Sequence, residues 1–248
     1  MTWSQYGSGV AIGLAASSLL ALALAPIGWR VGWWHYRFAF SWLMPLSGML
    51  ALGAIAVALL CLGLGWAFIG PSGGAIALIA LMIGACLAYV PWHYSRLRET
   101  LPRIHDITTD TDDPPEFAAV LAARTAERAA TTVYAGRELA MLQRSAYPDI
   151  VPLEVASAAR EAFQRALTVA KAMPGWTIVA SDPEAGRIEA SQSSRWFHFT
   201  DDVVIRITPT GAGSRIDMRS LSRQGRSDFG VNAARIRSYM QALRQHLA

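Results

Sequence analysis

Charged side chains are distributed unevenly along the chain and divide it into two parts. Before residue 96 the only formally charged side chains are Arg30 and Arg37, whereas all 18 acidic residues come after residue 98. The hydrocarbon core of a bilayer excludes charge, and a helix needs roughly 20 apolar residues to cross it. The pattern therefore predicts a transmembrane region over residues 1–95. Its three spans are expected near residues 10–27, 42–69 and 75–92.

The ends of these runs carry signals that are typical of membrane helices. The run 10–27 is only 18 residues long, and a cleaved signal peptide is the alternative interpretation. That alternative is disfavoured because no basic segment precedes the run and a second apolar block follows closely. The sequence GPSGG at Gly70–Gly74 predicts the turn between the second and third spans.

The arginines near the spans predict the orientation of the polar part. With three spans, the loop that carries Arg30 and Arg37 lies on the same side as Arg96, Arg98 and Arg103. Because cytoplasmic loops are enriched in basic residues, a cytoplasmic polar part is predicted. A periplasmic polar part is the alternative.

The polar part is predicted to consist of a linker, residues 96–116, and one folded domain, residues 117–248. Apolar positions at spacings of three and four predict helices over residues 117–144, 154–173 and 230–247. An interruption of the first helix near Tyr134–Gly136 is an alternative. Period-two alternation between turn signals predicts four strands, over residues 176–181, 187–191, 202–208 and 214–222. The expected fold is therefore three transmembrane α-helices followed by a soluble α+β domain, with a four-stranded antiparallel sheet packed against helices.

One face of the predicted sheet is apolar and the other is charged, because successive side chains alternate between the faces. The charged positions are Arg187, Glu189, Asp202, Arg206, Arg215, Asp217 and Arg219. Opposite charges on neighbouring strands contribute roughly 0.2–1 kcal/mol per pair. A salt-bridged, solvent-exposed face is one interpretation of this pattern. A charged groove for a polar ligand is the other.

Residues 222–237, SRQGRSDFGVNAARIR, surround the start of the last helix. Free backbone amides and the helix dipole attract anions at such a position, so a phosphate or carboxylate site is one interpretation. The other is that Asp228 caps the helix and occupies those amides. With the charged strand face, this stretch makes nine candidate binding residues: Asp202, Arg206, Asp217, Arg219, Arg223, Arg226, Asp228, Asn232 and Arg235.

The polar part carries none of the common catalytic or metal-binding motifs. It contains no HExxH, GxSxG or GxxxxGK[ST] sequence and no cysteine. Its histidines, His105, His198 and His246, lack the spacing of metal ligands. We therefore expect no metal and no cofactor. The net charge of +4 comes from interspersed signs without a stacking-aromatic motif, which disfavours nucleic acid as a partner.

Five blocks of the polar part form a recognisable set: PRIHDITTD at 102–110, YPDIVPL at 147–153, GRIEA at 186–190, DDVVIRI at 201–207 and DMRSLSRQGRSDFGVNAARIR at 217–237. In these blocks, and in their order, the chain closely resembles the domain of unknown function 1499 family, over roughly residues 102 to 247. The predicted spans lie outside the likeness. The family has no established reaction or ligand, so the resemblance carries over no catalytic residue. It implies a bacterial protein, and many members are exported or membrane-tethered, which disagrees with a cytoplasmic domain.

The leading functional hypothesis is a multi-pass protein of the bacterial inner membrane with a non-catalytic binding or accessory domain. Its partners would be the lipid bilayer and either a membrane protein or an anionic ligand. A membrane-tethered enzyme is the first alternative, for example a hydrolase that uses Asp202 or Asp217 in a concave pocket. A structural subunit of a membrane complex is the second alternative. Fold class alone does not separate these functions.

Overall fold

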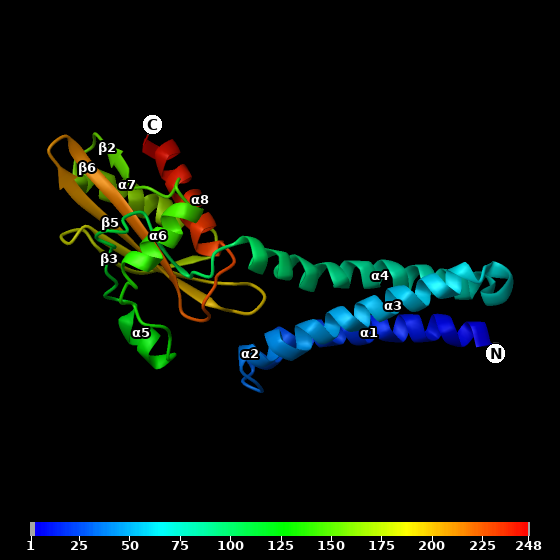
Figure 1. Cartoon of the computed structure of the whole chain (residues 1–248). Coiled ribbons are helices and arrows are strands. Elements are labelled where there is room, and N and C mark those ends of the chain that lie inside the picture. The colour runs from blue at the N-terminus through cyan, green and yellow to red at the C-terminus, as the bar shows by residue number, and fades with distance from the viewer. Residues whose placement is uncertain (1–2, 248) are drawn as a thin grey trace. The chain divides into compact units, whose positions relative to one another are not determined.

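The computed structural model describes residues 3–247. The chain divides into two compact units, Met1–Glu99 and Thr100–Ala248. Long apolar helices make up the first unit, and a β-sheet with helices makes up the second (Figure 1).

The first unit contains the three long apolar helices that the sequence predicts. They are α1 (Trp3–Arg30), α3 (Met44–Gly63) and α4 (Trp66–Thr100). A short α2 (Tyr36–Phe38) and a π-helical turn, η1 (Ala39–Leu43), precede α3. The segments Tyr6–Arg30, Tyr36–Gly63 and Ile69–Thr100 are each long and apolar enough to cross a membrane.

The connection between the second and third long helices has two breaks, and the second of them lies in the predicted GPSGG turn. Helix α3 ends at Gly63 and α4 begins at Trp66, and Gly65 between them has a positive φ of 84°. Within the expected GPSGG turn only Gly70 leaves the helical conformation, with φ 67° and ψ 171°. Pro71 follows it and is tolerated there because the first turn of a helix needs no backbone donor.

Small side chains form the contacts inside the first unit. Ala11, Ala54 and Ala80 are fully buried, and the hydroxyl of Ser18 donates to the carbonyl oxygen of Ser47 at 2.8 Å. Large side chains point outward, among them Leu20, Leu52, Leu60 and Met82. Small residues at the helix contacts and large apolar ones outside are typical of helices packed in a membrane.

The sheet of the second unit has six strands, not the predicted four. Its strands are β1 (Asp106–Thr108), β2 (Leu153–Val155), β3 (Trp176–Asp182), β4 (Arg187–Ser193), β5 (Thr200–Thr210) and β6 (Gly213–Ser222). All pairs are antiparallel in the order β1–β6–β5–β4–β3, and β2 pairs with β6 beside β1. The two additional strands have three residues each, too few to show a period of two. The stretch expected as a linker thus contributes a strand.

Two helices, α7 (Ala159–Ala172) and α8 (Val231–Leu247), cover one face of this sheet (Figure 1). The apolar strand positions meet them in the core, which includes Ile188, Val203, Ile205, Ile216 and Met218 with Phe163, Ile236 and Tyr239. The predicted helix over 154–173 begins only at Ala159, because residues 153–155 pair with β6 instead.

The opposite face is covered by residues 109–136, which we call the strap. The predicted helix over 117–144 is not continuous: only α5 (Leu121–Ala126) and α6 (Arg137–Ala146) are helical, and the break between them includes the expected interruption near Tyr134–Gly136. Between them Thr131, Thr132 and Val133 form a β-branched run that disfavours a helix. The strap is anchored by apolar contacts as well, since Phe117 and Val120 pack with Val204 and Leu221 on the sheet.

Gly213 should be needed for the contact between β6 and the strand β2. It has a φ of 151°, and an added Cβ would lie 2.1 Å from the carbonyl oxygen of Val155. We expect Gly213→Ala to lower the free energy of unfolding by at least about 2 kcal/mol. An alanine would be strained at this positive φ, and its Cβ would overlap the backbone of β2. Calorimetry of the detergent-solubilised full-length protein measures this. Gly211→Ala, where a Cβ meets nothing within 4 Å, is the control; equal melting of the two variants would contradict the pairing.

Candidate functional site

The charged strand face is neither solvent-exposed nor an open groove. The side chains of Glu189, Asp202 and Asp217 are 0 % exposed, and Arg219 is 2 % exposed. The strap lies over them and supplies partners for each. Burying charges is costly unless each one is paired and hydrogen-bonded, so the pairing decides what this face can do.

Asp202 on β5 lies at the centre of one buried cluster. Arg223 donates to both of its carboxylate oxygens, from Nε at 2.9 Å and from Nη2 at 2.7 Å. Arg124 of the strap donates at 2.7 Å, and the Ser191 hydroxyl donates at 2.6 Å. Burial alone would raise the pKa of Asp202, but the hydrogen bonds from Arg223, Ser191 and Arg124 together hold it below its ordinary value. The group is a carboxylate whose acceptor positions are occupied.

Asp217 on β6 belongs to a second cluster nearer the edge of the strap. Arg215 donates to it from Nε at 3.0 Å and Arg206 from Nη2 at 3.3 Å. The same two arginines reach acids of the strap: Arg215 pairs with Asp110 at 2.6 Å and Arg206 with Asp113 at 2.8 Å. The predicted neighbours Arg206 and Asp217 are thus brought together, within an ion-pair network.

Arg219 on β6 is held by a bidentate pair with Asp106 of β1, with distances of 2.8 and 2.7 Å. It also donates to the carbonyl oxygen of Thr132 at 2.7 Å, and its guanidinium lies 5.2 Å from the ring centre of Phe117 and 5.5 Å from that of Tyr134. Every side of this arginine is therefore occupied by the protein itself.

The residues around the start of α8 divide into a cap and a second buried network. Asp228 accepts hydrogen bonds from the backbone amides of Gly230 at 2.9 Å and Asn232 at 2.8 Å, so its carboxylate occupies the anion position. Burial raises the pKa of Asp228, against the effect of these two donors. Arg235 pairs with Asp201 at 2.6 Å, and its Nη1 also donates to Asn232.

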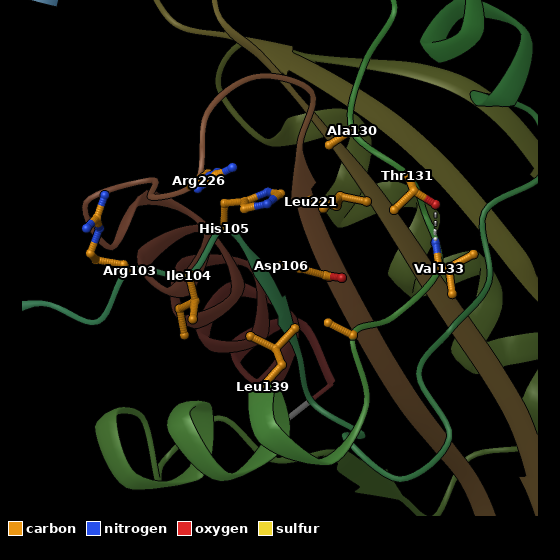
Figure 2. Close-up of a pocket in the computed structure, with 11 residues that line it drawn as sticks. Arg103, Ile104, His105, Asp106, Ala130, Thr131, Val133, Leu139, Leu221 and Arg226 are labelled. Carbon is orange, nitrogen blue, oxygen red and sulfur yellow. Dashed lines mark hydrogen bonds between the residues drawn. The ribbon is translucent and has the colours of Figure 1, made fainter. Parts of the chain in front are cut away.

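Arg226 alone among the nine predicted residues is exposed with no ion pair or hydrogen bond to a described residue. It lines a cavity of about 310 Å³ in the second unit. The other lining residues are Arg103, Ile104, His105, Asp106, Ala130, Thr131, Val133, Ala135, Leu139 and Leu221. Figure 2 shows Arg103, His105 and Arg226 at one end of the cavity, and Thr131 and Val133 at the other.

The cation-rich end of the cavity has two further properties that suit an anion. Arg103 is exposed and, like Arg226, has no partner among the described residues. The ring atom Nδ1 of His105 is buried without a hydrogen-bond partner in the described structure. The one acid of the lining, Asp106, is neutralised by Arg219. Two free guanidinium groups therefore dominate the charge of the cavity.

Sequence reasoning missed most of this cavity. Arg103, His105 and Asp106 fall in the expected linker, and Thr131 to Ala135 fall in the expected helix. The signal that could have found them is the first block of the family resemblance, PRIHDITTD, whose start already holds Arg103 and His105.

Asp202→Asn should lower the free energy of unfolding by roughly 3 kcal/mol or more, because it leaves two buried guanidinium groups without their anion. Asp112→Asn, which removes a partner that is 85 % exposed, should change it by less than about 0.5 kcal/mol.

The depressed pKa of Asp202 means that its contribution to stability is present above the unfolded value of 3.8 and is lost as pH falls through the folded pKa. Calorimetry of the full-length protein between pH 7 and pH 2 should therefore show a shallower acid loss in Asp202→Asn. Equal stability of wild type and Asp202→Asn at pH 7 would contradict a structural role.

Comparison with known proteins agrees with the blocks noted in the sequence. No curated protein matches the chain. The crystal structure of protein MLL2253 from Mesorhizobium loti is similar at 14 % identity, over 39 % of this chain and 93 % of that one. Its TM-score of 0.33 is too low to carry an argument. A family model described as a protein of unknown function (DUF1499) matches residues 106–243, more than half of the 248 residues. The chain therefore belongs to the DUF1499 family.

Proposed function

We propose that this is a three-span protein of the bacterial inner membrane whose C-terminal domain is a non-catalytic binding module for an anionic ligand. The observation that carries the proposal is a pair of guanidinium groups, those of Arg103 and Arg226, which lie at one end of a cavity and have no partner within residues 3–247. Arginine binds carboxylates and phosphates well because its planar donors match two oxygens at once.

The remaining predicted residues support the binding site indirectly. Asp202, Asp217, Arg219 and Arg223 are buried in ion pairs, so they stabilise the strap rather than meet a ligand. A hydrolase that used Asp202 or Asp217 as a base lacks support, since arginines occupy both carboxylates and neither residue lines the cavity.

The position of the cavity in the chain supports a ligand at the membrane. Arg103 lies 11 residues after Trp92, an aromatic residue of the kind that marks the membrane–water interface. Even a fully extended chain of that length spans at most about 40 Å. The arginine is therefore tethered within about 40 Å of that interface, which supports a ligand that is found at the membrane.

The double variant Arg103→Glu/Arg226→Glu should lose anion binding. Each charge-assisted hydrogen bond contributes about 1.5–3 kcal/mol, so we expect at least a tenfold weaker affinity. Titration of inorganic phosphate and butyl phosphate into the full-length protein in nanodiscs, followed by ³¹P NMR, measures it. The matched control is Arg160→Glu/Arg244→Glu, which reverses two exposed arginines that lie outside the cavity lining. Equal binding by both double variants would show that the site is elsewhere.

The arginine distribution also predicts the side of the membrane. Green fluorescent protein fused after Ala248 should fluoresce, and alkaline phosphatase at the same position should be inactive, because the domain is expected in the cytoplasm. An active phosphatase fusion with a dark fluorescent fusion would place the domain in the periplasm.

A further inference from the structure

We propose that the ligand of this cavity is a single-chain anionic amphiphile, with its head at Arg103 and Arg226 and its apolar tail in the cavity. The inference rests on the proposed function and specifies the part of the ligand that does not contact the arginines, which is an apolar tail. The cavity has one cationic end and an apolar remainder, which no simple inorganic anion would use.

The lining away from the arginines is mostly apolar. Ile104 and Leu139 form one side, and Val133 lies at the end opposite Arg226 (Figure 2). Val133 is 76 % exposed, although removing an apolar side chain from water is favourable. An alkyl chain in the cavity would cover Val133 and contact Leu139 without displacing any hydrogen-bonded group of the apolar walls.

The polar lining residues favour an anionic head group only at the end of the cavity that carries Arg103 and Arg226. The carboxylate of Asp106 cannot repel the head strongly, because both of its oxygens accept hydrogen bonds from Arg219. The buried Nδ1 of His105 lies at the cationic end and lacks a partner, and buried polar atoms of this kind are usually satisfied by some group. Rotation of the imidazole would expose this atom, and its N–H would then donate to a bound carboxylate or phosphate oxygen.

The size of the cavity limits the tail. A volume of about 310 Å³ lies at the lower end of small-molecule sites. It therefore suits one short alkyl chain, and the two long chains of an ordinary phospholipid exceed it.

Chain length is the variable that tests this inference. We would titrate inorganic phosphate and the ethyl, butyl, hexyl, octyl, decyl and dodecyl phosphates into the full-length protein in zwitterionic nanodiscs. The affinity should rise roughly fourfold per methylene, since each buried methylene contributes about that factor, and should level off within this series once the tail fills the cavity. Decanol should bind at least tenfold more weakly than decyl phosphate.

The cavity-filling variant Ala135→Trp separates binding in the cavity from partition into the lipid. It should abolish the rise with chain length and leave the affinity for ethyl phosphate unchanged. Ala123→Trp, at an exposed position on α5 outside the lining, is the matched control and should behave as wild type. Partition into lipid would give the same rise in all three proteins, and that result would overturn the inference.

Failure of this inference can be told from failure of the proposed function. If ethyl and decyl phosphate bind equally well and both need Arg103 and Arg226, the anion site stands and the tail site is wrong. If no alkyl phosphate binds more weakly to Arg103→Glu/Arg226→Glu than to wild type, both proposals are wrong.

Discussion

The buried pairing of arginines with carboxylates between the sheet and the strap is the interaction on which the rest of the domain depends. Three strands present acids or arginines to the face that the helices leave open. The strap supplies Arg124 to Asp202, Asp110 to Arg215 and backbone amides to Glu189. Such a layer is stable only when nearly every donor and acceptor is matched, because unpaired charges at these positions would be costly. Glu189 shows how closely this holds: its two oxygens accept three successive backbone amides, from Ala118, Ala119 and Val120, at 2.9–3.1 Å.

This layer also determines where the domain can bind something else. Arginines that are held by Asp202, Asp217 and Asp106 direct most of their donors to those carboxylates, and among the described residues only the buried Nε atoms of Arg124 and Arg206 lack a partner in these clusters. The guanidinium groups that are available to a ligand lie at the margin of the layer. There the strap, β1 and the loop before α8 leave a cavity with Arg103 and Arg226 at one end. The same residue type therefore stabilises the fold in one place and is available for recognition in another, and only burial distinguishes the two.

Much of the architecture could be predicted from the sequence because it depends on periodicity. The scarcity of charge before Arg96, where only Arg30 and Arg37 occur, indicated the three apolar helices, and the alternation around Val203 and Ile216 placed the two faces of the sheet correctly. The strands β1 and β2 could not be predicted, because three residues carry no period. The cover over the charged face could not be predicted either, since it depends on contacts such as Arg124 with Asp202, which are 78 residues apart. The candidate site was therefore assigned to residues that turn out to be buried, and only Arg226 of the predicted set lines the cavity.

Native-state hydrogen exchange of the full-length protein tests most directly whether the strap is locked onto the sheet. If Glu189 holds the amides of residues 118–120, they should exchange as slowly as the central strands β5 and β6, through global unfolding only. Exchange of these amides within seconds, at the rate of an open loop, would show that the charged face is accessible and that its arginines are free to bind ligands.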